Sequence, residues 1–219
     1  MKILILTLAD EPYWPIARIS NPNKAAYAAK HGYDFRTYSH RLAEDLPASW
    51  SKLHILFDNF TGTGYYDWFF WTDADSLIMN SELKLEDLIG DTEATIIAAY
   101  DENGLNTGQF LIKNNFAGYD LIWRADGHRE YVNHAWWEQP AIEAAILERG
   151  GDSVIMTVDP GLLNRTVPSG PQHNTFSKMI DQTNKVFEVN DFILHWSGCG
   201  GERAPLRLEM MKAFLEVAQ

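Results

Sequence analysis

Two carboxylates, Asp73 and Asp75, directly follow an apolar and aromatic run from Tyr66 to Thr72. Side chains two residues apart in an extended segment point the same way, so both can reach one cation. If that run is a strand of an α/β sheet, its carboxyl end lies at the edge where ligand clefts form. Carboxylate oxygens suit Mg²⁺ or Mn²⁺. The pair predicts a divalent metal site; the alternative is two acids that cap a loop.

A late histidine and a short polar segment offer further site residues. His195 ends the apolar run 192–194 and precedes the glycine-rich segment 198–201, whose backbone N–H groups suit phosphate oxygens. The other interpretation is a histidine that packs beside Trp196. The segment Asn106-Thr107-Gly108 opens a predicted strand, where Gly108 would let the backbone approach a ligand. A plain turn before the strand explains the same residues.

Glu138 and Gln139 stand directly before Pro140, at the start of a predicted helix. Their side chains are expected to enter a cleft, although acids are also favoured at a helix start by the helix dipole. The adjacent Trp136 and Trp137 cannot both face a core on regular structure. One of them is a candidate stacking platform for a sugar ring, and the alternative is an apolar bridge between helices.

Lys52 lies in the first turn of a helix that Ser49 is expected to cap, where a cation is unfavourable. It is therefore a candidate ligand-binding residue, or else a solvated surface lysine. The apolar run 3–9 predicts a strand buried on both faces, and its last residues lie at the same sheet edge as the acid pair.

Strands and helices alternate along the chain, which predicts an α/β fold with a mixed sheet. Asn21 is expected to cap a helix with Pro22 at its first position, and Gly32 to end it. The loop 159–184, rich in Pro, Asn and Gly, is the candidate mobile lid. Further strands are expected near 33–38, 95–100, 108–113, 154–158 and 192–196, and further helices near 116–123, 140–149 and 205–217.

Composition limits the function. A chain of 219 residues favours one domain over 1–219. The net charge of −12 argues against nucleic acid and anionic lipid as partners. A single cysteine, Cys199, cannot form an internal disulfide. Since no signal peptide or apolar span is visible, we expect a soluble, cytoplasmic protein.

Four segments in order resemble retaining glycosyltransferases of the GT-A fold, most closely glycosyltransferase family 34, with its galactosyl-, xylosyl- and mannosyltransferases. They are 71–79, 104–114, 138–141 and 195–199, and the resemblance spans roughly 22–202. It implies a Rossmann-like, mostly parallel mixed sheet flanked by helices, and a nucleotide-sugar donor. It also implies transfer to a glycan or other hydroxyl acceptor with retained anomeric configuration, and a metal held by Asp73, Asp75 and His195.

The resemblance also assigns roles to residues. We expect Gln139 near the anomeric carbon with Glu138 as electrostatic support, although the family usually has Asp where this chain has Glu138. Many members have a lysine where Gly200 stands, which leaves Arg203 as the nearest cation for phosphate. Tyr13 is a candidate cover for the base. The complete set of expected donor-binding residues is Thr7, Leu8, Ala9, Tyr13, Lys52, Thr72, Ala74, Asn106, Thr107, Gly108, Gly198, Gly200 and Arg203.

Two other functions stay open at this point. A phosphatase or phosphotransferase would use Asp73 as nucleophile and Asp75 as acid, but it would place the motif after the first strand. A nucleotide-sugar-binding module would keep the fold without turnover. We expect a uridine donor, and Mn²⁺ rather than Mg²⁺, because an imidazole ligand suits Mn²⁺ better.

Overall fold

The computed structural model describes residues 1–60, 64–101, 103–167, 187–188, 190–197 and 204–218. Its central sheet has six strands in the order β2-β1-β3-β6-β5-β7, with β6 antiparallel to both neighbours and the other five parallel to one another. The mixed, mostly parallel sheet expected from the sequence is thereby confirmed. The strands are β1 (Ile3–Leu8), β2 (Asp34–Tyr38), β3 (Trp68–Thr72), β5 (Ile96–Asp101), β6 (Gly104–Lys113) and β7 (Ile155–Val158).

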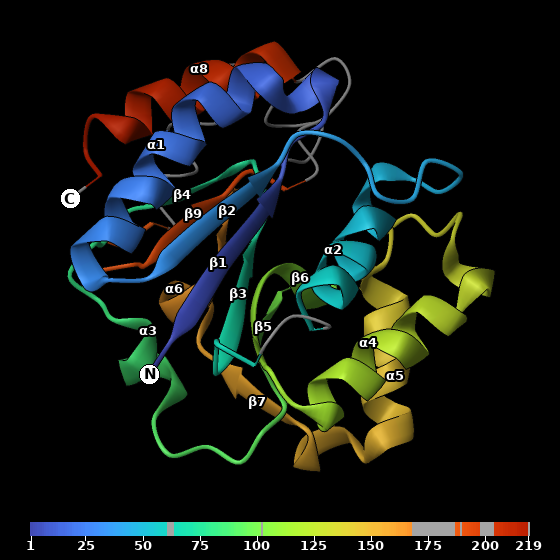
Figure 1. The fold of residues 1–219 in the computed structure, drawn as a ribbon. Helices are drawn as coiled ribbons and strands as arrows, with labels where there is room; N and C mark the ends of the chain where they lie inside the picture. Colours follow the sequence, from blue (N-terminus) through green and yellow to red (C-terminus); the bar gives the residue numbers. More distant parts are fainter. Residues whose placement is uncertain (61–63, 102, 168–186, 189, 198–203, 219) are drawn as a thin grey trace.

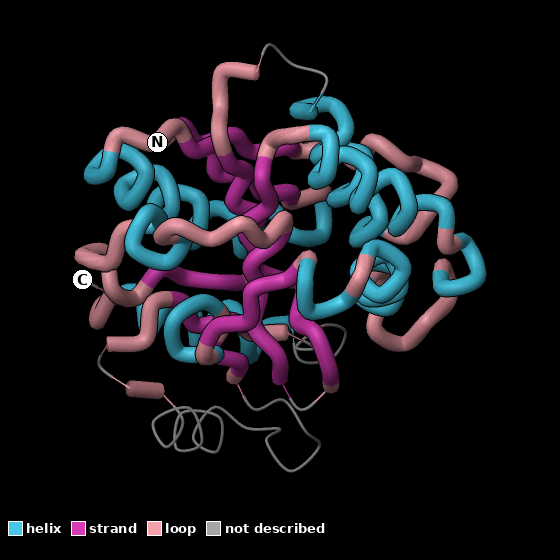
Figure 2. Tube along the Cα trace, turned by 90° about the horizontal axis from the view of Figure 1, so that it is seen from below, coloured by secondary structure: helices cyan, strands magenta, loops and turns pink. Residues whose placement is uncertain are grey.

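Helices cover both faces of this sheet (Figures 1 and 2). One face packs against α2 (Ser51–Phe60), α4 (Phe116–Gly127) and α5 (Gln139–Arg149). The other packs against α1 (Trp14–His31), α3 (Leu85–Ile89), α6 (Pro160–Leu163) and a small sheet ordered β4-β9-β8. That sheet contains β4 (Ser76–Ile78), β8 (Arg165–Thr166) and β9 (Ile193–His195), and α8 (Ala204–Leu215) lies beside α1. Short 3₁₀ turns are Glu11–Tyr13, Ala48–Trp50, Arg129–Tyr131 and Gly151–Ser153.

The first strand shows why the sheet is buried on both sides. Leu4 and Leu6 pack toward the side of α2, whereas Ile3 and Ile5 pack toward α1. Alternate side chains of a strand point to opposite faces, so an unbroken apolar run fits only a covered strand. The carboxyl ends of β1 and β3 lie next to each other because the two strands are parallel neighbours. The acid pair of the candidate site directly follows β3 at this edge of the sheet.

Two expected helix starts are wrong. The first helix begins at Trp14, and Pro22 lies inside it; Pro15 occupies the early helical position that favours proline. Ile16 and Ala17 explain the two extra turns, since they pack into a cluster with residues of α8. Ser49 does not cap α2, because 48–50 form a 3₁₀ turn instead. The helix end at Gly32, which is left-handed with φ 72°, is confirmed.

The expected lid contains regular structure in its first part. Residues 159–167 include α6 and β8, and residues 168–184 of that loop lie outside the described residues. Short strand β4, directly after the acid pair, was missed by the sequence analysis. Among the described residues, no helix combines the length and apolar character that crossing a bilayer requires.

Candidate metal and donor site

The acid pair and the late histidine come together at the carboxyl end of β3. Asp73 and Asp75 lie in the turn between β3 and β4, and β4 pairs with β9 so that Ser76 is opposite His195. The N–H of Trp196 donates to the carbonyl of Asp75 at 2.9 Å, which ties the two strands together at this turn. One ligand atom from each of Asp73, Asp75 and His195 lies within 4.8 Å of the other two.

The two carboxylates each have one oxygen held from outside the cluster. Asp73 Oδ1 accepts from Trp71 Nε1 at 2.7 Å and lies 3.4 Å from Lys52 Nζ. Asp75 Oδ2 accepts from Arg207 Nη1 at 2.7 Å. The remaining oxygens, Asp73 Oδ2 and Asp75 Oδ1, face the histidine. Each carboxylate is therefore oriented by its own partner, with one oxygen left for a cation.

The histidine is oriented in the same way. His195 Nδ1 lies 3.0 Å from Asn164 Oδ1, which makes Nδ1 the ring donor because an amide oxygen can only accept. Nε2 then faces Asp75 Oδ1 at 3.3 Å and Asp73 Oδ2 at 3.9 Å. A ligating histidine typically donates its other ring N–H to such a partner. Two carboxylate oxygens and one imidazole nitrogen fit Mn²⁺, and three protein ligands leave positions for a substrate.

The charges around Asp75 keep its carboxylate ionised. Burial alone raises the pKa of Asp75, but while no cation is bound the hydrogen bond and charge of His195 and the charge of Arg207 outweigh burial and lower that pKa to about 2. Asp75 therefore carries its full negative charge near neutral pH. An ionised, buried carboxylate of this kind is a strong ligand for a divalent cation.

Gly108 makes room for the imidazole of His195, a contact that the sequence did not predict. A Cβ at this position would lie 2.9 Å from His195 Nδ1 and closer still to Cε1. The absence of a side chain thus lets the imidazole pack against β6. Asn106 holds the backbone at this point of β6, since its Oδ1 accepts from the N–H of Gly108 at 2.9 Å and its Nδ2 donates to Asp101.

Lys52 is buried between the acid pair and Glu138, and its ammonium contacts both. Its ammonium forms an ion pair with Glu138, donates to the carbonyl of Thr107 at 2.8 Å, and faces Asp73. The interpretation of Lys52 as a solvated surface lysine is therefore wrong. Glu138 also accepts from the Thr107 hydroxyl at 3.1 Å and is 3% exposed, so its carboxylate is enclosed by protein groups instead of projecting freely.

The neighbours of Glu138 are more open. Gln139 is half-buried, and its Nε2 makes only a long 3.4 Å hydrogen bond to the carbonyl of Asn103. Trp136 and Trp137 are 45% and 59% exposed, which argues against an apolar bridge between helices. Trp137 has φ 57°, and among the described residues it alone combines a side chain with a positive φ.

The other expected donor-binding residues fall into three groups. Four of them are buried: Thr7, Ala9, Thr72 and Ala74. The methyl group of Ala74 packs in a cluster with Trp196, so Ala74 offers a ligand only its backbone. Leu8 and Tyr13 are half-buried at the carboxyl end of β1 and just beyond it, and the Tyr13 ring lies 4.8 Å from the Arg207 guanidinium. Gly198, Gly200 and Arg203 lie outside the described residues.

Sequence reasoning missed Asn164, Arg207 and Lys24. Asn164 and Arg207 hold site side chains, and the Lys24 ammonium donates to the carbonyl of Asp73 at 2.6 Å. No local spacing links them to the acid pair; only the topology brings them together. The burial of Lys24 and Arg207, which is unusual for cationic side chains, becomes visible only in the folded chain.

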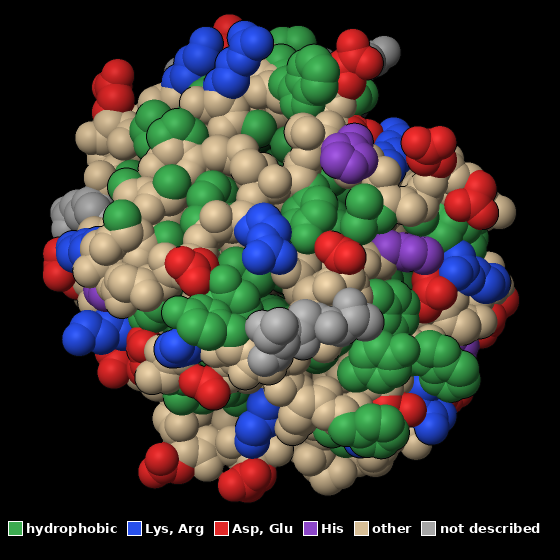
Figure 3. Space-filling model, in the orientation of Figure 1, with side chains coloured by type: hydrophobic (Ala, Val, Ile, Leu, Met, Phe, Trp, Pro, Cys, Tyr) green, Lys and Arg blue, Asp and Glu red, His purple; other side chains and the backbone are tan. Residues whose placement is uncertain are grey.

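Charge on the outer surface is mixed. On the face drawn in Figure 3, described Lys and Arg side chains are scattered among acidic ones and form no continuous basic area. This distribution agrees with the net charge of −12 and offers no footprint for a phosphate backbone on that face.

The sequence is similar to known glycosyltransferases. Residues 2–94 match the galactosyl transferase GMA12/MNN10 family. The chain is 27% identical, over 89% of its length, to a probable alpha-1,6-mannosyltransferase, MNN10, of Saccharomyces cerevisiae. It is 28% identical, over 63% of its length, to an uncharacterized alpha-1,2-galactosyltransferase of Schizosaccharomyces pombe. The chain spans only 58% and 47% of the lengths of these two curated relatives.

The fold is similar to those of solved glycosyltransferase structures. A glycosyltransferase involved in the glycosylation of the major capsid of PBCV-1 aligns with a TM-score of 0.75 at 19% identity, over 97% of this chain and all of that one. The galactosyltransferase LgtC, in complex with donor and acceptor sugar analogs, aligns with a TM-score of 0.58 at 12% identity, over 99% and 96%. The expected resemblance is confirmed: the chain is similar in sequence to glycosyltransferase family 34, the GMA12/MNN10 family, and has a GT-A-like fold.

Proposed function

We propose that this chain is one GT-A-like domain that acts as a metal-dependent, retaining glycosyltransferase. It would transfer a hexose or pentose from a nucleoside diphosphate sugar to a glycan or another hydroxyl acceptor. The observation that carries the proposal is the cluster of Asp73, Asp75 and His195, in which each ligand is oriented by a separate partner. Acid pairs that merely cap a loop need no such arrangement. The activities for which the relatives are named, mannosyl and galactosyl transfer, support the reaction class.

The donor would bind along the carboxyl edge of β1 and β3. Leu8 and Tyr13 lie at and just beyond the end of β1, where a base and ribose can reach the backbone, and β3 leads directly into the acid pair. A bound Mn²⁺, with Mg²⁺ as the alternative, would neutralise the diphosphate as it leaves. This also explains how a protein with net charge −12 can bind an anionic donor. We propose a uridine donor.

Retention would follow a front-face path. Glu138 is a poor candidate nucleophile because Lys52 and Thr107 already occupy its carboxylate. Its charge is better placed to support a cationic sugar centre from nearby. Gln139 is half-buried and weakly bonded, so its amide is available to a sugar. We propose Gln139 as the residue beside the anomeric carbon, while the departing diphosphate takes the acceptor proton.

An acceptor sugar would stack on the tryptophans that precede Glu138. Residues held at unfavourable backbone angles cluster at functional sites, since the strain must be offset by the surrounding structure. Trp137 shows such an angle, with φ 57°, and presents an exposed indole one residue before Glu138. Indole faces pack well against the C–H faces of sugars. We therefore propose Trp137, with Trp136, as acceptor-binding residues.

Thermal unfolding with a panel of nucleotide sugars, with and without Mn²⁺, tests the donor and the metal together. A ligand stabilises by RT ln(1 + [L]/Kd), so the true donor raises Tm most, and only when Mn²⁺ is present. Asp75→Asn should abolish that Mn²⁺-dependent rise and most sugar transfer while the fold survives. Full transfer in excess chelator contradicts the proposal, and donor binding without transfer or hydrolysis indicates a binding module.

A further inference from the structure

A buried lysine lies beneath the acid pair and has no place in the mechanism above. Lys24, in α1, is fully buried, and its ammonium donates to the main-chain carbonyl of Asp73 at 2.6 Å. The Ser76 hydroxyl donates to the same carbonyl at 2.8 Å. One oxygen at the centre of the metal-binding turn is thus held by two donors.

The residue before Lys24 holds the strand that follows this turn. Asn23 Nδ2 donates to the carbonyl of Ile78 at 2.9 Å, and Asn23 Oδ1 accepts from the N–H of Ile78 at 2.8 Å. The pair of bonds replaces a strand partner for Ile78 on that side. Two consecutive residues of α1 therefore fix both ends of the segment 73–78, which contains both acidic ligands.

Packing alone does not explain a lysine at this position. Placing an ammonium in the interior is unfavourable unless it is paired or well hydrogen-bonded. Burial lowers the pKa of Lys24 to about 7, against the charges of Asp75 and Asp73, which raise it. A methionine would fill a similar space at no such cost. What the ammonium supplies and a methionine would lack is the hydrogen bond to the turn.

The cations around the acid pair have distinct acceptors. Lys52 from α2 faces Asp73 Oδ1, Arg207 from α8 binds Asp75 Oδ2, and Lys24 from α1 binds the backbone. In the described part of the chain, the Lys24 ammonium bonds none of the four carboxylate oxygens of Asp73 and Asp75. Its contribution is thus to the direction of the peptide that joins Asp73 to Ala74, and hence to where both carboxylates point.

We propose that Lys24 is a positioning residue for the metal site, which holds the Asp73-Ala74-Asp75 turn in its cation-binding conformation through the Asp73 carbonyl. The inference rests on the proposed binding of a divalent cation by Asp73, Asp75 and His195. The role of Lys24 can fail while the metal site stands, because the three ligands could bind a cation even if another residue fixed the turn.

Whether loss of the Lys24 ammonium weakens or tightens Mn²⁺ binding separates a positioning role from a purely electrostatic one. A cation near a bound Mn²⁺ repels it, so removing the charge alone would tighten Mn²⁺ binding. Removing a group that orients metal ligands instead weakens binding, typically by about 10–100-fold. We expect Lys24→Met to weaken Mn²⁺ binding about 10-fold or more, measured in the sugar-free protein by the electron paramagnetic resonance signal of free Mn²⁺.

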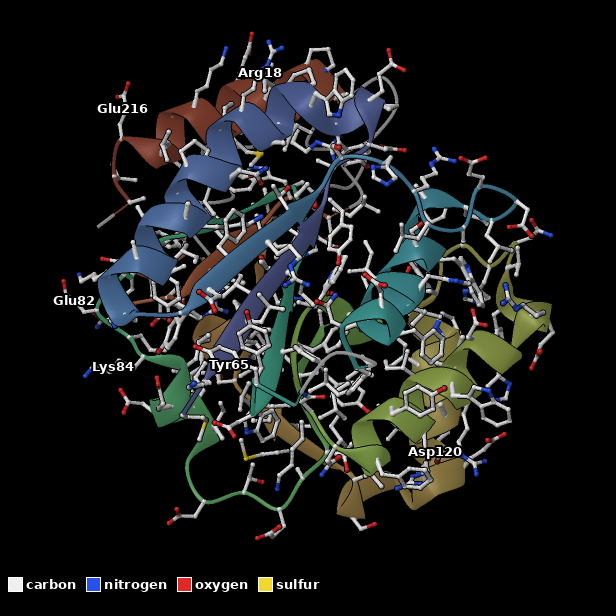
Figure 4. The ribbon with its side chains drawn as sticks, in the orientation of Figure 1. Arg18, Tyr65, Glu82, Lys84, Asp120 and Glu216 are labelled. Carbon is white, nitrogen blue, oxygen red and sulfur yellow. The ribbon has the colours of Figure 1, made fainter. Side chains whose placement is uncertain are left out.

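Matched variants give the control. Lys30→Met removes a lysine from the same helix, at its exposed end, where Lys30 pairs with Glu82. Figure 4 shows Glu82 at the periphery of the molecule, pointing outward. Lys30→Met should keep wild-type Mn²⁺ affinity. Ser76→Ala, which removes the second donor to the Asp73 carbonyl, should weaken Mn²⁺ binding by a smaller factor than Lys24→Met.

Lys24→Gln decides the matter if Lys24→Met does not fold. Its amide removes the charge but keeps an N–H donor, so we expect Mn²⁺ binding weaker than wild type and, where both fold, tighter than Lys24→Met. Wild-type or tighter binding by a folded Lys24 variant overturns the inference while the metal site stands. Absence of Mn²⁺ binding by the wild-type protein overturns the metal site itself.

Discussion

A methyl group added at Gly108 should disable the metal site without touching a metal ligand. In Gly108→Ala the new Cβ would lie 2.9 Å from His195 Nδ1, whereas ordinary contacts begin at 3.4 Å. The imidazole must therefore move by at least about 0.5 Å, which is the tolerance that a functional constellation allows. Since Nδ1 is also bonded to Asn164 at 3.0 Å, the movement disturbs that hydrogen bond as well.

The expected loss follows from the coordination. A displaced or rotated imidazole loses most of its bond to a cation, and disturbing an orienting partner typically costs about 10–100-fold in metal affinity. That factor corresponds to about 1.4–2.8 kcal/mol of binding free energy. We expect Gly108→Ala to weaken Mn²⁺ binding by this factor, as measured by calorimetric titration of the metal-free protein.

A matched glycine separates this effect from a general change in stability. A Cβ at Gly127, at the end of α4, would meet no heavy atom within 4 Å. Gly127→Ala should keep wild-type Mn²⁺ affinity. If Gly108→Ala also binds Mn²⁺ as wild type does, His195 is not a metal ligand and the reasoning from its packing fails.

Further expectations address the rest of the site. Lys52→Met leaves Glu138 buried without its cation and should lower the free energy of unfolding by about 3–5 kcal/mol; an unchanged urea midpoint would count against the buried pair. The pKa of Asp75, about 2, lies below its unfolded value, so its stabilisation is complete above about pH 4 and disappears as pH falls through 2. In the metal-free protein that contribution is about 2 kcal/mol, and Asp75→Asn should lack it in unfolding titrations across this range. Gln139→Ala should lower kcat far more than donor affinity, and equal losses would remove Gln139 from the reacting centre. Trp137→Gly should relieve the backbone and raise the acceptor KM, with donor binding unchanged; an unaltered acceptor KM refutes the stacking role.

The central sheet was predictable because its strands carry their own signal. The run 3–8 is apolar at every residue except Thr7, and such a run is stable only when both faces are covered. The position of the acid pair followed in the same way, because Asp73 and Asp75 come directly after the run that forms β3. The start of α1 was not, because Asn21 and Pro22 imitate a helix start while the packing of Ile16 on α8 extends the helix past them.

The supporting residues of the site could not be predicted from spacing. Arg207 and Asp75 lie 132 residues apart, and only the packing of α8 brings the guanidinium to the carboxylate. Lys52 was singled out as unusual for its position in a helix, but its partner was not foreseen. The packing of the His195 imidazole against Gly108 was not foreseen either. Local sequence thus indicates which residues are chemically unusual, while the topology determines what they contact.

The anomeric configuration of the first released sugar tests the central claim most directly. In the absence of acceptor, a glycosyltransferase often hydrolyses its donor slowly, so the reaction can be followed by proton NMR with the nucleotide sugar that raises Tm most. From an α-linked donor with Mn²⁺, the account predicts that the α-anomer appears first, before mutarotation, and that chelator stops its release. Initial release of the β-anomer, or release that persists in excess chelator, would contradict a metal-dependent, retaining transferase.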